Sequence, residues 1–415
     1  MKKAFFIGYV WPEPSTTAAG HRMVQLLEAF QSFGYHITFG STALKTEHSL
    51  DLDALGVKSV NIALNDSSFD AFIQKLKPDI VIFDRFMIEE QFGWRVAEFS
   101  PQALRVLNTE DLHALRKARE EVHKKKHLFS LDDWRNHPMT VREVASMYRS
   151  DISLMVSSYE MEILQNELGI SENLLFHLPL LFDRLENSVT SKWPSHKARK
   201  DFVCIGNGKH APNVDSIQVL KKEIWPLIRK QLPDAHLYVY GAYLPQQIEE
   251  MHHPKEGFHI VGWTKDIETV LKNARLLLAP LQFGAGIKGK LLDAMCCGTP
   301  SITTAIGTEG MHGDLPWCGS IVDDWDSFAK TAVELYLNPS KWEKAQKNGI
   351  VLINRFYEKE FLQQSLKQKI DDVITNLDTH RSQNFIGLML QHHTQASTKY
   401  MAKWIEAKNR NQEIS

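Results

Sequence analysis

The sequence is poor in cysteine, has no long apolar run and carries no excess of charge of either sign. Its 415 residues include four cysteines, without the paired spacings of a disulfide framework. The simplest interpretation is an intracellular, reduced protein. We expect the adjacent Cys296 and Cys297 to be apolar packing residues. No window approaches 18 apolar residues, so we expect no transmembrane helix.

Other classes of protein are excluded in the same way. The formal net charge is −2, so the chain lacks the basic field that attracts nucleic acid, and we expect no nucleic-acid partner. No low-complexity tract and no internal repeat occurs. The apolar run after the charged start ends at Pro12, which indicates a first β-strand rather than a signal peptide.

Short apolar runs alternate with longer helical patterns, which is typical of parallel α/β structure. The expected strands of the first half are "KKAFFIGYV", "YHITFGST", "DIVIFDR", "ALRVLNT", "DISLMVSS" and "NLLFHLP". Those of the second half are "DFVCIG", "AHLYVYG", "FHIVGW", "ARLLLAPL", "PSITT" and "GSIVDD". The polar segment 184–200 separates the two halves and is predicted to be a linker.

The expected helices include "AAGHRMVQLLEAFQSFG", with a stop at Gly34, and "SSYEMEILQNELG", in which Ser157 and Glu160 have the spacing of a capping box. From Trp325 onward the pattern is helical, with breaks near Pro339, Phe356 and Asp378. The chain therefore divides into residues 1–183, the linker 184–200, a second domain over 201–355, and C-terminal helices over 356–415. Those last helices are expected to pack on the first domain or on a second subunit.

Two such domains would face each other across a cleft formed by the carboxyl ends of their strands, where ligands bind in folds of this kind. The loops at those ends hold most of the glycine, histidine, lysine and acidic residues. In "FGAGIKGKLLDAM" two lysines, Lys288 and Lys290, stand at the entry to a helix. Cations are unfavourable there unless an anion lies between them, and a helix N-terminus with glycines suits a phosphate. Asp293 lies one turn on and could accept hydrogen bonds from a ribose. The alternative is a solvated lysine pair with a surface aspartate.

The segment "PLQFGAGIKGKLLDAMCCGTPSITTAIGTEGM" resembles the donor site of family 4 glycosyltransferases, formerly called group 1, which have the two-domain GT-B fold. Most of the chain is covered by the resemblance, but only this segment is highly specific. Residues that match the family pattern are Pro280, Gly284, Gly286, Lys288, Asp293, Ala294, Met295, Gly298, Pro300, Thr303, Thr304, Glu309 and Gly310. One departure is Ala285, where many members have a glutamate that contacts the donor sugar. The Gly-x-Gly-x-Lys branch commonly lacks this glutamate.

Two further loops of the second domain resemble parts of the same family. "GNGKHAPN" has the spacing of a dinucleotide fingerprint, but the next strand ends without the acid that NAD binding needs, so NAD is rejected. The loop matches the family at Gly206, His210, Pro212 and Asn213, where it faces the donor phosphates. "IVGWTKD" resembles the loop beside the nucleotide base through Gly262, Trp263 and Asp266, although an N-cap is the favoured role for Asp266.

The first domain offers fewer signals. His113 in "NTEDLHALRKARE" matches a histidine that lies at the donor sugar in the family, with a helix-surface histidine as the alternative. Arg22 could face phosphate or acceptor, or lie on the surface. We expect Glu160 to be structural. The basic run "LRKAREEVHKKKH" is expected to be a solvated face, with contact to anionic lipid as the alternative.

The resemblance implies a retaining hexosyltransferase-type enzyme that moves a sugar from a nucleotide-diphosphate sugar to a glycan, a lipid or another hydroxyl acceptor. The implied catalytic residues are His113 and Lys288. The donor would be bound by Gly206, His210, Asn213, Gly262, Trp263, Gly284, Gly286, Lys288, Gly289, Lys290 and Asp293. We expect no metal and no other cofactor, since no Asp-x-Asp pair stands at a matching place. A cytoplasmic location follows, with peripheral contact to the inner face of a membrane as an option. A non-catalytic sugar-nucleotide binding or scaffold protein, and another enzyme of the GT-B fold, remain alternatives.

Overall fold

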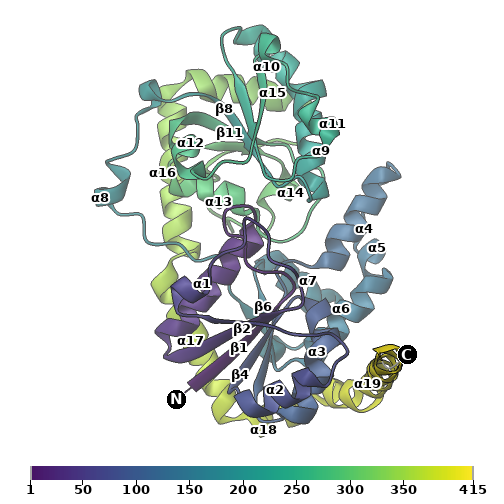
Figure 1. Ribbon diagram of the computed structural model, residues 1–415. Helices are drawn as coiled ribbons and strands as arrows, with labels where there is room; N and C mark the ends of the chain where they lie inside the picture. The colour runs from purple at the N-terminus through teal and green to yellow at the C-terminus, as the bar shows by residue number, and fades with distance from the viewer. Residues whose placement is uncertain (1, 414–415) are drawn as a thin grey trace.

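Two parallel β-sheets, each flanked by helices, form the two halves of the molecule (Figure 1). The computed structural model describes residues 2–413. The first sheet has the order β3-β2-β1-β4-β5-β6-β7 and the second β10-β9-β8-β11-β12-β13. Every neighbouring pair of strands in both sheets is parallel. The carboxyl ends of each sheet therefore share one edge, and the fold is the α/β GT-B architecture expected from the sequence.

The strands are short and mostly buried on both faces, as parallel strands covered by helices are. Those of the first sheet are β1 (Lys2–Gly8), β2 (Tyr35–Ser41), β3 (Lys58–Asn61), β4 (Ile80–Asp84), β5 (Leu104–Asn108), β6 (Ile152–Met155) and β7 (Leu175–His177). Those of the second are β8 (Lys200–Ile205), β9 (Leu237–Tyr240), β10 (Phe258–Gly262), β11 (Ala274–Ala279), β12 (Ser301–Thr303) and β13 (Gly319–Ile321). All the expected strands occur. The sequence did not reveal β3, because "KSVN" is a polar, half-exposed edge strand.

Helices separate nearly all of these strands. In the N-terminal half they are α1 (Ala18–Ser32), α2 (Ser68–Leu76), α3 (Phe86–Phe99), α4 (His113–Lys124), α5 (Leu131–Arg135), α6 (Pro138–Arg149) and α7 (Ser158–Leu168). Next come α8 (Asn187–Thr190), α9 (Ala211–Val219), α10 (Trp225–Gln231), α11 (Gln246–Glu249), α12 (Ile267–Asn273), α13 (Gly289–Cys296) and α14 (Ala305–Thr308). The last are α15 (Trp325–Leu337), α16 (Pro339–Phe356), α17 (Lys359–Thr375), α18 (Leu377–Gln383) and α19 (Phe385–Glu413).

One helical segment is interrupted. Between α9 and α10 the segment Leu220–Ile224 is π-helical and ends two residues before Pro226. Proline has no backbone N–H, and its ring conflicts with the carbonyl four residues earlier, so the helix accommodates it by widening one turn.

The C-terminal helices cross back to the N-terminal half (Figure 1). Helix α16 runs between the two halves, and α17 places Leu366, Ile370 and Val373 in the same apolar cluster as β1 and α1. Helix α19 packs against α3 and α6. The break expected near Asp378 falls at Asn376, and a further break at Asn384 was not expected.

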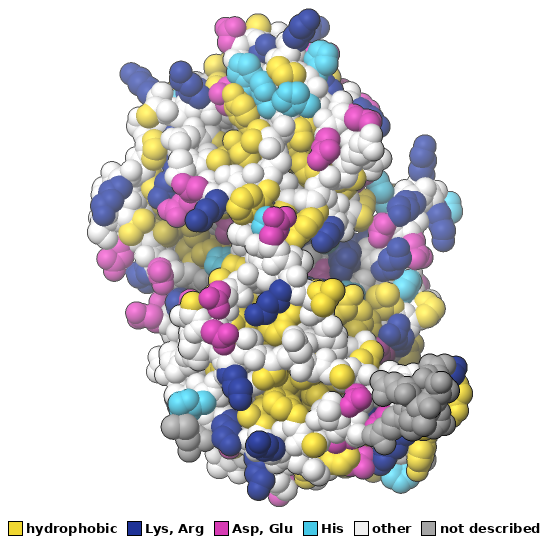
Figure 2. All heavy atoms as spheres, in the orientation of Figure 1, with side chains coloured by type: hydrophobic (Ala, Val, Ile, Leu, Met, Phe, Trp, Pro, Cys, Tyr) yellow, Lys and Arg dark blue, Asp and Glu magenta, His cyan; other side chains and the backbone are white. Residues whose placement is uncertain are grey.

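The segment predicted to be a linker is fixed to the second sheet rather than free. It holds α8 and a 3-10 turn at His196–Ala198. The side chain of Arg199 is fully buried and donates to the Thr299 hydroxyl at 2.6 Å and the Cys297 carbonyl at 2.8 Å. On the visible face of the molecule, charged side chains of both signs are interspersed, in keeping with the small net charge (Figure 2).

Candidate functional site

A cavity of about 580 Å³ lies between the carboxyl ends of the two sheets. The loop after β1 and the loops after β4 and β5 line it from the N-terminal half. The loops after β8, β9, β10 and β11 line it from the C-terminal half. The sequence-predicted residues that lie in this lining are His113, Gly206, His210, Asn213, Trp263, Gly284, Gly286, Lys288, Gly289, Lys290 and Asp293. Gly262 is not in the lining; it has a φ of +85° at the end of β10.

The loop after β11 carries both lysines into this cavity. Its turn depends on glycine, because Gly286 has a φ of +65° and a Cβ there would lie 2.8 Å from the Cβ of Asp111. The Lys288 ammonium donates to the Gly286 carbonyl at 2.8 Å, and that of Lys290 to the Asn213 side-chain oxygen at 2.6 Å. Burial lowers the pKa of Lys288 to about 8 and also lowers that of Lys290. An anion between them would relieve this cost.

Asp293 lies one turn into α13 and borders the same cavity. Within residues 2–413 its carboxylate makes no hydrogen bond or ion pair, and burial raises its pKa to about 7. A buried carboxylate normally has donors around it. Asp293 therefore has two free acceptor oxygens directed at a site where hydroxyl donors would stabilise the ionised form.

The loop after β8 folds closely around Asn213. A Cβ on Gly206 would lie 2.5 Å from the Asn213 side chain, so this position requires glycine. Asn213 donates to the Asn207 carbonyl at 3.0 Å while it accepts from Lys290, which links this loop to the lysine loop. His210 stands at the N-cap of α9 without a capping hydrogen bond, and burial lowers its pKa to about 4. It is therefore neutral at physiological pH.

Trp263 closes the cavity on the side of the second sheet. Its indole Nε1 donates to the Ser15 carbonyl at 3.3 Å, and its ring lies 4.8 Å from that of His48. Both partners belong to the N-terminal half, so the two halves touch here. Asp266 is the N-cap of α12, accepting from the Thr269 N–H at 2.9 Å, as expected.

His113 begins α4 on the opposite wall. Its Nδ1 lies 3.2 Å from an Asp111 carboxylate oxygen and 3.6 Å from one of Glu143. Burial alone would lower the pKa of His113, but these two carboxylates outweigh it and raise the pKa. Arg116 also donates to the Asp111 carboxylate, at 2.7 Å. His113 is thus a buried side chain at the cavity, next to two carboxylates, and not a surface histidine.

The basic run on α4 is not simply a solvated face. Arg119 is 5% exposed and donates from both terminal nitrogens to the Glu309 carboxylate, at 2.8 and 2.7 Å, and to the Gly284 carbonyl at 2.8 Å. His123, one turn on, lies against Phe283 with ring centroids 5.0 Å apart. Arg116, Arg119 and His123 share one helix face, which is the signal that sequence inspection could have used.

Glu160 has a structural role, as expected, but a different one from the capping box. The Ser157 hydroxyl caps α7 as expected, but the Glu160 carboxylate does not complete a capping box. It accepts instead from the N–H of Gly286 at 2.7 Å and from that of Leu112 at 3.2 Å. Burial raises the pKa of Glu160 to about 8. Glu160 and Arg119 together fasten the lysine loop to the N-terminal half.

Ala285, at the position of the missing glutamate, packs in the apolar cluster of the N-terminal half together with Leu112 and Leu115. Ala285 also borders the cavity between the two sheets. Two acids of the loop after β5, Glu110 and Asp111, border the same cavity. Burial, and then the charge of Asp84, raises the pKa of Glu110 to about 7.

Arg22 faces neither solvent nor the cavity. Its side chain is 1% exposed and donates to the Asn108 side chain at 2.8 Å and to the Pro179 carbonyl at 3.1 Å. The expected surface position of Arg22 is therefore wrong. Its role is to hold the end of β5 against the loop after β7.

Comparison with known proteins places this geometry in a class. A model of the family described as "Glycosyl transferases group 1" matches residues 199–338, which contain the whole second sheet. Sucrose-phosphate synthase from Thermosynechococcus elongatus has a similar structure, with a TM-score of 0.65, 15% identity, and coverage of 91% of this chain and 100% of that one. WaaG, a glycosyltransferase of lipopolysaccharide biosynthesis, gives a TM-score of 0.62, 14% identity and coverage of 90% and 99%.

HepE from Anabaena, solved with UDP and glucose, gives a TM-score of 0.65, 12% identity and coverage of 89% of this chain and 100% of that one. No curated protein sequence matches this chain. None of the helices among residues 2–413 has both the length and the apolar character that a membrane crossing requires. In the same part of the chain, no three His, Cys, Asp or Glu side chains are grouped so that they could hold a metal ion.

Proposed function

We propose that this protein is a retaining family 4 glycosyltransferase, of the branch that lacks the first glutamate, and that it uses a nucleotide-diphosphate sugar. The observation that carries the proposal is the lysine loop: two buried ammonium groups and the N-terminus of α13 border one cavity, with the free carboxylate of Asp293 one turn beyond. This set complements a diphosphate followed by a ribose. The bound UDP and glucose of the similar HepE structure agree with such a donor.

In this proposal the donor diphosphate lies between Lys288 and Lys290, and the ribose hydroxyls donate to Asp293. Negative charge grows on the diphosphate as the glycosidic bond breaks. Cations that are already in position stabilise that charge more in the transition state than in the ground state. Lys288 and Lys290 would thereby supply what a metal ion supplies in other transferases, and we expect turnover to persist in EDTA.

The sugar would lie between the lysine loop and the loop after β5. His113, whose pKa is raised by the neighbouring Asp111 and Glu143, would donate a hydrogen bond to a sugar hydroxyl. Since the side chain of Ala285 has no carboxylate, Asp84, Glu110 and Asp111 would be candidates from the N-terminal half to bind sugar hydroxyls. The acceptor hydroxyl would attack from the face that the diphosphate leaves, which retains the anomeric configuration. Product configuration measured by NMR tests this point, and an inverted product would exclude it.

The acceptor is proposed to be a glycan, a lipid or another hydroxyl compound bound by the N-terminal half. The location is proposed to be cytoplasmic, which agrees with four free cysteines. Contact with the inner face of a membrane would use the end of α4, where Lys124 and Lys125 are exposed beside Leu128, which is 97% exposed. Sedimentation with anionic vesicles tests this contact.

A thermal-shift screen tests the proposed donor. Full-length protein is heated with UDP, GDP, TDP and ADP and their sugar conjugates, because a bound ligand stabilises by RT ln(1 + [L]/Kd). We expect one nucleotide series to raise the Tm and the double variant Lys288→Ala, Lys290→Ala to lose that shift. The matched control is Lys344→Ala, Lys347→Ala, two exposed lysines on α16. Equal shifts in wild type and the Lys288/Lys290 variant would exclude the phosphate assignment.

A further inference from the structure

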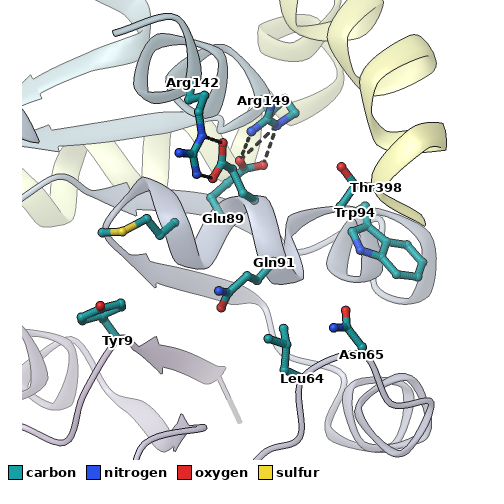
Figure 3. Close-up of a pocket in the computed structure, with 11 residues that line it drawn as sticks. Tyr9, Leu64, Asn65, Glu89, Gln91, Trp94, Arg142, Arg149 and Thr398 are labelled. Carbon is teal, nitrogen blue, oxygen red and sulfur yellow. Dashed lines mark hydrogen bonds and ion pairs between the residues drawn. The ribbon is translucent and has the colours of Figure 1, made fainter. Parts of the chain in front are cut away.

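A second cavity, of about 570 Å³, opens in the N-terminal half beside the first (Figure 3). We call it the side pocket. Its walls come from the loops after β1 and β3 and from α3, α6 and α19. Tyr9 borders both the side pocket and the cavity between the two sheets. The two cavities therefore share the side chain of Tyr9 as part of their walls.

The charged side chains of the side pocket are already paired with one another. Arg149 donates to both carboxylate oxygens of Glu89 at 3.0 Å, and Arg142 binds Glu90 through two hydrogen bonds, at 3.0 and 2.6 Å (Figure 3). The two acids and two bases cancel in charge. A charged ligand would have to break a pair and leave one group without its partner, so the pocket favours an uncharged ligand.

The neutral polar side chains, in contrast, are unused. Within residues 2–413 the side chains of Asn65, Gln91 and Thr398 make no hydrogen bond, although all three border the pocket. Trp94 is 3% exposed, and its Nε1 is buried without an acceptor. In Figure 3 the nitrogen is on the side of the indole that is turned toward Gln91. Amides, a hydroxyl and an indole N–H together match a ligand with many hydroxyl groups.

Apolar surface completes the lining. Tyr9 and Leu64 remain 42% and 41% exposed, and Met87 lies in the same wall. A pyranose presents both hydroxyl edges and apolar C–H faces, so it can use both kinds of surface. The volume is within the range of about 300–1,000 Å³ that is typical of small-molecule sites.

We propose that the side pocket binds an uncharged saccharide, which is the part of the acceptor next to the sugar that receives the transferred unit. The saccharide would hydrogen-bond to Asn65, Gln91 and Trp94 and pack on Tyr9 and Leu64. The reacting hydroxyl would then lie in the cavity beyond Tyr9. The assignment as an acceptor rests on the proposed function, whereas saccharide binding in this pocket does not.

Saturation-transfer NMR on the full-length protein tests the proposal. The probes are neutral disaccharides, namely maltose, cellobiose, mannobiose and N,N′-diacetylchitobiose, with sialyllactose as the anionic comparison. We expect at least one neutral probe to bind. The variant Asn65→Ala, Gln91→Ala should weaken that binding by about tenfold or more, since it removes two ligand hydrogen bonds. Gln102→Ala, an exposed amide in the turn between α3 and β5, should leave it unchanged.

Three results would overturn the proposal: no neutral probe binds, only the anionic probe binds, or the double variant binds as wild type does. Nucleotide binding is measured separately in the thermal-shift screen. If nucleotides bind and the disaccharides do not, only the side-pocket assignment fails. If the disaccharides bind and nucleotides do not, the proposed function fails while the pocket assignment stands.

Discussion

The contact between Arg119 and Glu309 joins the two halves of the protein by a pair of short hydrogen bonds, and its removal gives a quantitative test of how the lysine loop is held. Arg119 makes two hydrogen bonds to the Glu309 carboxylate and one to the Gly284 carbonyl, all at 2.7–2.8 Å. The Glu309 side chain is 17% exposed. The variant Arg119→Met therefore leaves the largely buried carboxylate of Glu309 without its positively charged partner.

Removal of one partner of a buried ion pair costs about 3–5 kcal/mol, and the partial exposure of Glu309 places the expected loss near the lower end. Glu309→Gln alone should cost less, because the neutral amide still accepts from Arg119. The double variant should be more stable than the sum of the single losses predicts, with a coupling energy of about 2 kcal/mol. Urea unfolding of wild type, both single variants and the double variant measures this coupling.

Lys344→Met, an exposed residue on α16, is the control and should unfold as wild type does. Additive effects, with a coupling energy below about 0.5 kcal/mol, would refute the claim that this pair joins the two halves in solution. A coupling that appears equally with nucleotide present and absent would further show that closure does not depend on the donor.

Three further predictions concern the same loop. Burial raises the pKa of Glu160 from 4.5 to about 8, so between these pH values the folded state keeps a proton that the unfolded state has lost. The stability of the fold should therefore fall as pH rises from about 4.5 to about 8. The plot of Tm against pH should be flatter for Glu160→Gln, and parallel curves would contradict a raised pKa for Glu160. Burial raises the pKa of Asp293 to about 7. Nucleotide affinity, measured by calorimetry, should therefore increase as pH rises through 7 in wild type but not in Asp293→Asn. The same pH profile in both proteins would contradict the proposal that Asp293 binds the ribose. Gly286→Ala adds a Cβ 2.8 Å from Asp111 at a φ of +65°, with a strain of about 1–3 kcal/mol. This strain should weaken nucleotide binding by about 5- to 150-fold, whereas unchanged affinity would mean that the loop is free to move.

The architecture was largely predictable because most strands are short apolar runs bounded by turn residues. The exception, β3, has no such run. Its residues "KSVN" lie at a sheet edge and are only partly buried, so apolar side chains are not required there. The C-terminal tail was predicted to be helical, but the sequence did not decide whether it packs on the first domain or on a second subunit. Only the packed structure shows Leu366 and Ile370 against the first sheet.

The C-terminal wall of the site was predictable because one continuous segment provides the glycines, the lysines and Asp293. The N-terminal wall was not, because Arg119, Glu160 and Glu110 come from three separate elements. Arg119 and Glu160 act through contacts across the two halves, and the only local sign of them is the spacing of Arg116, Arg119 and His123 on one helix face. The same contacts give Ala285 an apolar surrounding, which the sequence could only show as a missing glutamate.

The return of the chain to its first sheet has a consequence for biosynthesis. Leu366, Ile370 and Val373 fill the same core as β1 and α1, and yet they leave the ribosome long after Leu181, the last apolar residue that the N-terminal half adds to this core after β7. At about 5–20 residues per second, roughly 10–40 s of translation separate Leu181 from Leu366. The domain that is made first is therefore the last to be completed, and its nascent form exposes an apolar groove that only the end of the polypeptide can cover.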